Sequence, residues 1–316
     1  MVLTFKGKTM NKKELLKLYD NDLEELVSLS EKITKENFPK KEIEVCSIIS
    51  AKTGKCPENC KYCSQSIHNH ADIFCHPLLK VEEVKQAALK AKENGASRFC
   101  IVTAGRSASG SDFEKILEMI RAVASIDGIH CCASLGLLNE EQIKKIKEAG
   151  VERFNHNINT SRNYHKGICT THNFEDRINT IKLLVKHGIE ACAGVILGMG
   201  ETREDRVDMA LSLAKLNPKT VPINVLNPIK GTALEGFVDK ITEEEVIRTI
   251  CIFRIAMPKA ILRYAGGRET RLSKKIQKLG LRAGINGMLV GNYLTTDGVE
   301  ISQDKELIKE YQKQQS

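Results

Sequence analysis

The sequence predicts an α/β protein built as a closed (β/α)8 barrel of the TIM type, with a helical extension at its N-terminus. Short apolar runs rich in β-branched residues alternate with longer helical patterns from about residue 43 to about residue 294. Eight such runs can be counted, which favours a closed barrel over an open sheet. No Gly-x-Gly-x-x-Gly follows the first run, so the main reason to expect a dinucleotide-binding fold is missing.

The expected strands are short, and each is followed by a stretch long enough for a helix. They cover residues 43–51, 98–104, 129–135, 153–159, 190–197, 220–226, 260–265 and 287–293. Between them, apolar residues recur at helical spacing, as at Val81, Val84, Ala88 and Ala91.

Helix boundaries are marked by capping residues. Thr242 with Glu245, and Asn139 with Gln142, have the spacing of capping boxes at helix starts. Glycines follow three predicted helix ends, at Gly95, Gly150 and Gly188.

The two ends of the chain differ from the barrel pattern. Residues 11–35 form an amphipathic helical segment, and residues 302–316, rich in Lys, Glu and Gln, predict an exposed helix or a frayed end. No composition break separates a second domain. We therefore expect an N-terminal extension over residues 1–42, a barrel over residues 43–297 and a tail over residues 298–316.

Composition limits the function classes. The 316 residues are 41% hydrophobic and 28% charged, which is typical of a soluble globular protein. There is no Trp, aromatic residues make up 5%, and the net charge of +8 is spread through helical segments. This pattern argues against a nucleic-acid partner, which would need stacking platforms or a basic tract.

The cellular setting is predicted from cysteine usage and hydropathy. Eleven cysteines is an odd number without the even spacing of a disulfide framework, so we expect a reduced, cytoplasmic protein. The N-terminus lacks the apolar core of a signal peptide, and no run approaches the roughly 18 apolar residues of a membrane span.

Three cysteines, Cys56, Cys60 and Cys63, carry the strongest chemical signal. They follow the first expected strand with the spacing Cys-x3-Cys-x2-Cys, and barrel active sites form at the C-terminal ends of strands. Three thiolates can hold three corners of an iron–sulfur cube and leave the fourth iron open. The alternative is a zinc site, which would need a fourth ligand from His68, His70 or Cys75.

A second set of cysteines lies within the expected strands. Cys100, Cys132 and Cys192 each occupy a different strand, and Arg263 puts a charge on a fourth. Inward-pointing residues of separate strands meet inside a barrel, so these side chains could share one metal centre. The alternative is that the cysteines are ordinary core residues.

Several segments together resemble the biotin synthase family of the radical S-adenosylmethionine superfamily. They are the cysteine trio and residues 99–105, 132–136, 154–161, 194–202 and 263–269. The resemblance spans roughly residues 43–297 and implies radical-mediated insertion of sulfur into dethiobiotin to give biotin. It implies that Cys56, Cys60 and Cys63 hold a [4Fe-4S] cluster that binds S-adenosylmethionine. It also implies an auxiliary [2Fe-2S] or larger cluster as sulfur donor, held by Cys100, Cys132, Cys192 and Arg263.

The resemblance implies further contacts with the two substrates. Backbone groups of Thr103, Ala104 and Gly105 would bind the methionyl amino group of S-adenosylmethionine, with the backbone from Ile196 to Gly198 near its adenosine. Amide side chains would serve the ribose and the ureido ring of dethiobiotin; these are Asn155, Asn157, Asn159 and Asn224.

One departure concerns Cys131, which directly precedes Cys132. Neighbouring strand residues face opposite ways, so only one of the two can point into the barrel. Alignment on Leu135-Gly136 selects Cys132, leaving Cys131 as outer-face packing or as an extra ligand of a larger cluster. The remaining cysteines are expected to pack as small hydrophobes; they are Cys46, Cys75, Cys169 and Cys251.

Partners and alternatives follow from the same resemblance. It implies a homodimer, a reducing electron-transfer protein and the iron–sulfur assembly machinery as partners. A hydrogenase-cofactor maturase-like or methylornithine synthase-like enzyme would share the trio without needing Cys100, Cys132, Cys192 and Arg263 together. A non-catalytic iron–sulfur or sulfur-carrier scaffold would leave S-adenosylmethionine uncleaved.

Overall fold

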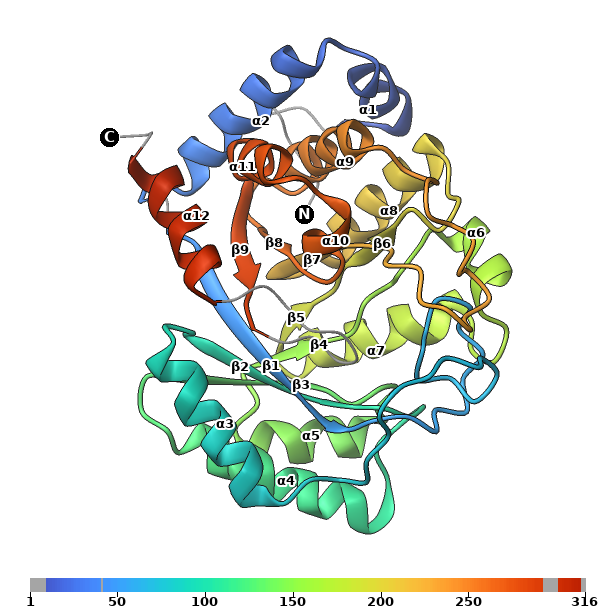
Figure 1. Ribbon diagram of the computed structural model, residues 1–316, viewed down its shortest axis with the longest axis vertical. Coiled ribbons are helices and arrows are strands. Elements are labelled where there is room, and N and C mark those ends of the chain that lie inside the picture. Colours follow the sequence, from blue (N-terminus) through green and yellow to red (C-terminus); the bar gives the residue numbers. More distant parts are fainter. Residues whose placement is uncertain (1–9, 41, 292–300, 314–316) are drawn as a thin grey trace.

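The computed structural model describes residues 10–40, 42–291 and 301–313. In this part of the chain, nine parallel strands form one sheet in the order β5-β4-β3-β2-β1-β9-β8-β7-β6. A further pairing of β5 with β7 closes the sheet into a barrel (Figure 1). The strands are β1 Glu44–Lys52, β2 Arg98–Thr103, β3 His130–Ser134, β4 Arg153–Asn155, β5 Glu190–Cys192, β6 Val195–Leu197, β7 Thr220–Val225, β8 Ile261–Tyr264 and β9 Ile285–Leu289.

Strands β5 and β6 together occupy one barrel position, although a single strand was expected over residues 190–197. The break falls at Ala193 and Gly194, where the chain runs against Pro222 of β7. A Cβ on Gly194 would lie 1.9 Å from the Pro222 carbonyl oxygen, so only glycine fits. Because the two halves share one position, the barrel has eight strand positions, and the predicted (β/α)8 fold is confirmed.

The other strand boundaries shift by a few residues. Strand β4 ends at Asn155 instead of 159, and Asn159 adopts a left-handed backbone with φ 65° that no regular strand allows. Strand β9 begins at Ile285, two residues before the expected start, and ends at Leu289. The end expected at residue 293 lies outside the described residues.

Helices surround the sheet (Figure 1). They are α1 Lys12–Tyr19, α2 Leu23–Asn37, α3 Val81–Glu93, α4 Gly110–Ala124, α5 Glu140–Ala149, α6 Arg162–Ile168, α7 Phe174–Lys186, α8 Arg203–Leu216, α9 Glu243–Ala256, α10 Arg268–Arg271, α11 Lys274–Arg282 and α12 Ile301–Lys313. The expected capping box of Asn139 and Gln142 forms at α5. Gly95, Gly150 and Gly188 follow helix ends with positive φ, as predicted.

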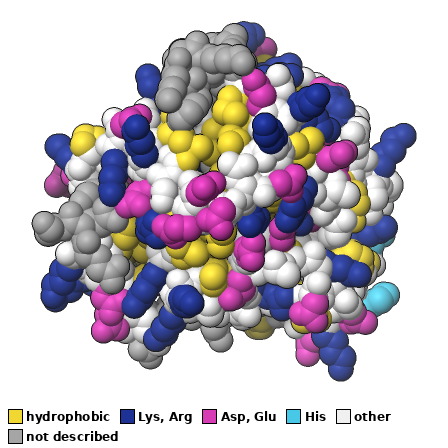
Figure 2. Space-filling model, turned by 90° about the horizontal axis from the view of Figure 1, so that it is seen from above, with side chains coloured by type: hydrophobic (Ala, Val, Ile, Leu, Met, Phe, Trp, Pro, Cys, Tyr) yellow, Lys and Arg dark blue, Asp and Glu magenta, His cyan; other side chains and the backbone are white. Residues whose placement is uncertain are grey.

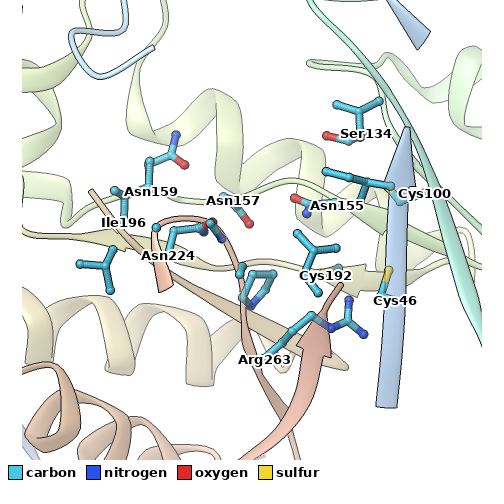
Figure 3. A pocket seen from close by; sticks show the side chains of 18 of the residues that line it. Cys46, Cys100, Ser134, Asn155, Asn157, Asn159, Cys192, Ile196, Asn224 and Arg263 are labelled. Atoms are coloured by element: carbon cyan, nitrogen blue, oxygen red, sulfur yellow. The ribbon is translucent and has the colours of Figure 1, made fainter. Parts of the chain in front are cut away.

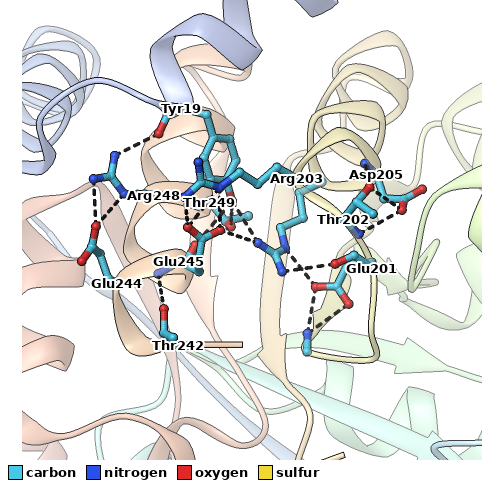
Figure 4. Close-up of polar contacts among 12 residues, drawn as sticks. Tyr19, Glu201, Thr202, Arg203, Asp205, Thr242, Glu244, Glu245, Arg248 and Thr249 are labelled. Carbon is cyan, nitrogen blue, oxygen red and sulfur yellow. Dashed lines mark hydrogen bonds and ion pairs between the residues drawn. The ribbon is translucent and has the colours of Figure 1, made fainter. Parts of the chain in front are cut away.

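The N-terminal helix α1 is fixed to α8 and α9 by a buried polar network around Tyr19 (Figure 4), and α2 packs against α9. The Tyr19 hydroxyl lies 2.5 Å from Thr249 Oγ1, and Arg206 donates to Glu245 at 2.7 Å. Thr242 caps α9, but Glu245 does not complete the expected capping box because its carboxylate pairs with Arg203 and Arg206. The helical extension is therefore packed onto the barrel wall.

The C-terminal helix α12 is also attached to the barrel, by a buried ion pair. Arg268 donates to both carboxylate oxygens of Asp304, at 2.8 and 3.0 Å, and both side chains are almost fully buried. The tail therefore forms a docked helix over Ile301–Lys313, where a helix exposed throughout or a frayed end was expected.

Acidic and basic side chains are interspersed on the face shown in Figure 2, without a continuous basic stripe. No helix in the described ranges is long and apolar enough to cross a membrane.

Arg254 in α9 is a fully buried arginine for which the structure provides carbonyl acceptors instead of a carboxylate. Its guanidinium donates to the backbone carbonyls of Ala260 and Gly284, each at 2.7 Å, and to Asn286 Oδ1 at 2.9 Å. Burial lowers its pKa to about 9. These bonds join the end of α9 to the starts of β8 and β9.

Replacing Arg254 with Met should lower the free energy of unfolding by about 3 kcal/mol, because several buried carbonyls lose their donors. Urea unfolding of the metal-free protein measures the effect. Arg121→Met, on the exposed face of α4, is the matched control and should change stability by no more than about 0.5 kcal/mol. An equal loss in both variants would contradict the role of the Arg254 bonds.

Candidate active site inside the barrel

A cavity of about 340 Å³ lies inside the barrel and collects the predicted strand ligands (Figure 3). Cys100 from β2, Cys132 from β3, Cys192 from β5 and Arg263 from β8 all line it. Strand register explains the grouping, since Cys100 pairs with Cys132 across β2 and β3. The sequence therefore brings these four distant side chains to one place. We call this space the inner cavity.

Cys131 points the other way, as the alternation of strand residues requires. It is buried in the apolar cluster between the sheet and its covering helices, whereas Cys132 packs with Cys100. The prediction that Cys132, and not Cys131, faces the interior is confirmed.

A half-buried carboxylate, Glu44 at the start of β1, binds three arginines next to the inner cavity. Arg98 donates to it at 2.8 Å and Arg153 at 2.6 Å, and Arg263 forms a third ion pair. Burial would raise the pKa of Glu44, but the neighbouring guanidinium groups lower it to about 2. Two further carboxylates also pair with these arginines: Glu190 lies 2.7 Å from Arg153 and 3.7 Å from Arg98, and Glu152 lies 3.8 Å from Arg98.

This electrostatic setting suits an anionic metal centre. Burial raises the pKa of Cys132 to about 12 and of Cys192 to about 11, against the opposing effect of the arginines. The thiols are therefore protonated at neutral pH until a metal displaces the protons. Arg263 Nε is buried without a hydrogen-bond partner among the described residues. Three thiols, a guanidinium Nε without a partner and the neighbouring arginines fit an iron–sulfur centre.

Replacing Glu44 with Gln should lower the free energy of unfolding of the metal-free protein by about 3 kcal/mol, because the buried Arg153 and Arg263 and the half-buried Arg98 lose a shared counter-ion. Urea denaturation reports the change. Glu118→Gln, on the exposed face of α4, serves as the matched control. Equal stability of Glu44→Gln and the control would show that the Glu44 ion pairs contribute nothing.

The cysteine trio lies on the loop after β1 and lines a second cavity of about 210 Å³, which we call the outer cavity. The loop is held by backbone bonds, with Cys63 N donating to Cys60 O at 3.0 Å and Cys56 N to Gln65 O at 2.9 Å. Thr103, Ala104 and Gly105 line the same space. The two cavities adjoin, because both are lined by Tyr62, Val102, Ser134, Asn155, Asn157 and Asn159.

Two residues next to the trio were missed by the sequence reasoning. The Cys60 thiol donates to Cys169 Sγ at 3.6 Å, and Cys169 Sγ lies 3.3 Å from His172 Nδ1. The hydrogen bond from Cys60 lowers the pKa of Cys169. The Cys-x2-His spacing of Cys169 and His172 is a metal-ligand spacing and could have drawn attention to them.

The ligand atoms of Cys60, Cys169 and His172 lie within 4.8 Å of one another, as the ligands of a single ion must. The trio forms no such compact group among the described residues. This does not argue against a cluster, since each thiolate of a cluster binds a different iron and can lie farther from the others. His68, His70 and Cys75, the fourth ligands considered for zinc, are exposed and belong to no such group among the described residues.

The predicted asparagines differ in how many of their polar atoms remain available. Both polar atoms of the Asn224 side chain form hydrogen bonds within the protein. Its Nδ2 donates to Val195 O at 2.9 Å, and its Oδ1 accepts from Gly266 N at 3.0 Å. Asn157 Oδ1 accepts from Gly194 N, and Asn159 Nδ2 donates to the Tyr62 hydroxyl. Asn155 faces both cavities, and its side chain has no hydrogen bond within the described part of the chain. Its amide is the best placed to meet a ligand.

Ile196 and Gly198, from the segment expected near adenosine, are placed differently. Ile196 lines the inner cavity, whereas Gly198 lines neither cavity. The Gly198 N–H donates to the Glu201 carboxylate at 2.9 Å, so this donor is already used within the protein.

The family models and the relatives that match this chain point to the same family. The Radical SAM superfamily model matches residues 51–213, and that of the Biotin and Thiamin Synthesis associated domain matches residues 222–314. The chain is 47% identical over 286 residues to the biotin synthase of Acetivibrio thermocellus, covering 90% of this chain and 88% of that protein. The biotin synthase of Clostridium perfringens is 42% identical over 306 residues, covering 97% and 95%. That of Methanococcus maripaludis is 43% identical over 306 residues, covering 95% and 92%.

Solved structures support the fold. Methylornithine synthase superposes with a TM-score of 0.79 at 21% identity, covering 90% of this chain and 83% of that one. A maturase of the [FeFe]-hydrogenase gives a TM-score of 0.81 at 17% identity, covering 96% and 71%. At these identities the likeness concerns the barrel fold alone.

Proposed function

The chain belongs to the biotin synthase family of radical S-adenosylmethionine enzymes, which insert sulfur, and we propose that its two adjoining cavities divide that reaction between them. The observation that carries the proposal is the shared wall. Asn155 and Asn157 border both the cavity of the cysteine trio and the cavity of the strand cysteines. A substrate held by these amides would reach both centres.

In the outer cavity, Cys56, Cys60 and Cys63 would hold the [4Fe-4S] cluster, and the free iron would bind S-adenosylmethionine. In the inner cavity, Cys100, Cys132, Cys192 and Arg263 would hold the auxiliary cluster. When bound, these groups supply a 5′-deoxyadenosyl radical and a sulfur atom, respectively.

The protein's own residues would bind and orient the substrates. Asn155 offers both an amide donor and a carbonyl acceptor, which suits the ureido ring of dethiobiotin. Asn159 Oδ1 and Asn157 Nδ2 remain for ribose or ureido contacts, since their other amide atoms bond within the protein. Asn224 would act through positioning, because it fixes Val195 and Gly266. The backbones of Thr103, Ala104 and Gly105 line the outer cavity, where the methionyl group would lie.

The barrel interior would protect the radical from side reactions. Apolar side chains of Ile48, Val102 and Leu289 line the inner cavity and limit water near the reacting carbon. A substrate held between two fixed centres is already oriented toward both of them, so the reacting groups need not meet by diffusion.

Partners and setting are part of the same proposal. The chemistry requires a reducing electron-transfer protein and delivery of clusters by iron–sulfur assembly machinery. All eleven cysteines are free thiols, which supports a reducing compartment such as the cytoplasm. We also propose a homodimer and a division into residues 1–42, 43–297 and 298–316, with the strand β1 starting just after the first boundary.

Anaerobic incubation of the cluster-loaded protein with dethiobiotin, S-adenosylmethionine and a reductant tests the function. We expect both 5′-deoxyadenosine and biotin, quantified by mass spectrometry. Formation of 5′-deoxyadenosine without biotin would favour a related radical enzyme with another substrate. Absence of both products would favour a non-catalytic scaffold.

A further inference from the structure

We propose that Cys46 is a fourth thiolate ligand of the inner iron–sulfur centre and takes the ligand position that the family resemblance gives to Arg263, an inference that rests on the proposed function of the inner cavity. Cys46 lies on β1 and lines the same cavity as Cys100, Cys132 and Cys192. It is 2% exposed and belongs to one small buried cluster with Cys100 and Cys132. The strand cysteines of this cavity therefore number four within the described residues.

The alternation of β1 fixes the direction of Cys46. Glu44, Cys46 and Ile48 are spaced two residues apart and face the barrel interior, where Glu44 binds the arginines and Ile48 lines the cavity. Val45, between them, packs against the outer apolar clusters. Cys46 can point only to the side where the other thiols lie.

The Cys46 thiol forms only a weak hydrogen bond among the described residues. Its hydrogen bond within the described residues is a 3.6 Å contact to the carbonyl of Ser47. Figure 3 shows the Arg263 side chain extending from β8 toward Cys46, with Cys192 beside them. The thiol is therefore placed where a metal bound to the other cysteines could reach it.

Arg263 has a competing partner, which strengthens the case for a thiol as fourth donor. Its guanidinium forms an ion pair with Glu44, two residues before Cys46 on the same strand face. Four thiolates complete the Cys₄ ligand set of an iron–sulfur cluster, and Arg263 can then remain with Glu44. Each added thiolate brings negative charge, and the guanidinium groups of Arg153 and Arg263 line the same cavity.

The inner centre can be examined alone in a background where Cys56, Cys60 and Cys63 are all replaced by Ala. Iron and sulfide per chain and the Mössbauer spectrum are measured after anaerobic reconstitution, without substrates. Cys46→Ala should lose at least half of the inner iron or shift its Mössbauer signals, while Arg263→Met should keep its iron. Cys251→Ala is the matched control, because Cys251 is equally buried but lies in the outer core.

If circular dichroism shows that Cys46→Ala folds poorly, Cys46→Ser tests the ligand role of Cys46 instead. Serine keeps nearly the same side-chain volume and offers an oxygen ligand. We expect Cys46→Ser to change the isomer shift of one iron site. Iron, sulfide and spectra unchanged in Cys46→Ser, with changed spectra in Arg263→Met, would overturn the proposal in favour of arginine. A background protein that binds no iron would instead refute the proposed function of the inner cavity, and the Cys46 role with it.

Discussion

Replacing any one of Cys56, Cys60 and Cys63 with Ala is expected to reduce 5′-deoxyadenosine formation to the level of a protein-free control. Each thiolate is proposed to hold one iron of the cluster that binds S-adenosylmethionine, so a missing thiolate removes a corner of the cube. The readout is anaerobic, reduced turnover followed by chromatographic quantification of 5′-deoxyadenosine. Retained formation in any of the three variants would refute the assignment.

Two matched controls sharpen this experiment. Cys75→Ala removes an exposed thiol outside both cavities and should retain full 5′-deoxyadenosine formation. Cys169→Ala removes the thiol beside Cys60 and should retain most of it, because Cys169 is not proposed as a cluster ligand. Loss of cleavage in Cys169→Ala equal to that in Cys60→Ala would show that the Cys60, Cys169 and His172 group holds the metal instead.

Cys100→Ala, Cys132→Ala and Cys192→Ala should each abolish biotin formation while leaving the outer cluster in place. Their thiols line the inner cavity but not the outer one, so cleavage of S-adenosylmethionine does not depend on them. The two products are measured together in one assay, which separates this result from general loss of folding. Biotin formation at the unmodified rate in any one variant would remove that cysteine from the ligand set.

The adjacent cysteine provides the control for this series. Cys131 is as buried as Cys132 but packs on the outer face of the sheet, so Cys131→Ala should keep most of the biotin-forming activity. Damage in Cys131→Ala equal to that in Cys132→Ala would contradict the strand register.

The fold was predictable because barrel strands are marked by local patterns. Alternating apolar runs and helical spacing depend on neighbours a few residues apart, and these identified all eight strand positions. The break between β5 and β6 was not predictable, because it arises where Gly194 meets Pro222, which is distant in sequence. The docking of α12 likewise depends on Asp304 finding a buried Arg268.

In the candidate site, too, some features could be predicted from local sequence patterns and others depend on contacts between residues distant in sequence. Cys100, Cys132 and Cys192 could be grouped from their strand positions together with the family resemblance. Cys46 also lies in an expected strand, but its inward direction requires the register of β1, which Glu44 reveals through its contacts with the arginines. The sequence could not predict which amide atoms of the asparagines stay free to bind a ligand, since each hydrogen bond within the protein depends on the local geometry.

The central claim is that an iron–sulfur cluster of the protein itself supplies the sulfur of biotin. The most direct test loads the protein with clusters built from heavy-isotope sulfide, removes free sulfide and allows a single turnover with dethiobiotin. Mass spectrometry of the biotin formed should show the heavy isotope. Biotin that carries only light sulfur, formed by a fully loaded protein, would contradict the claim.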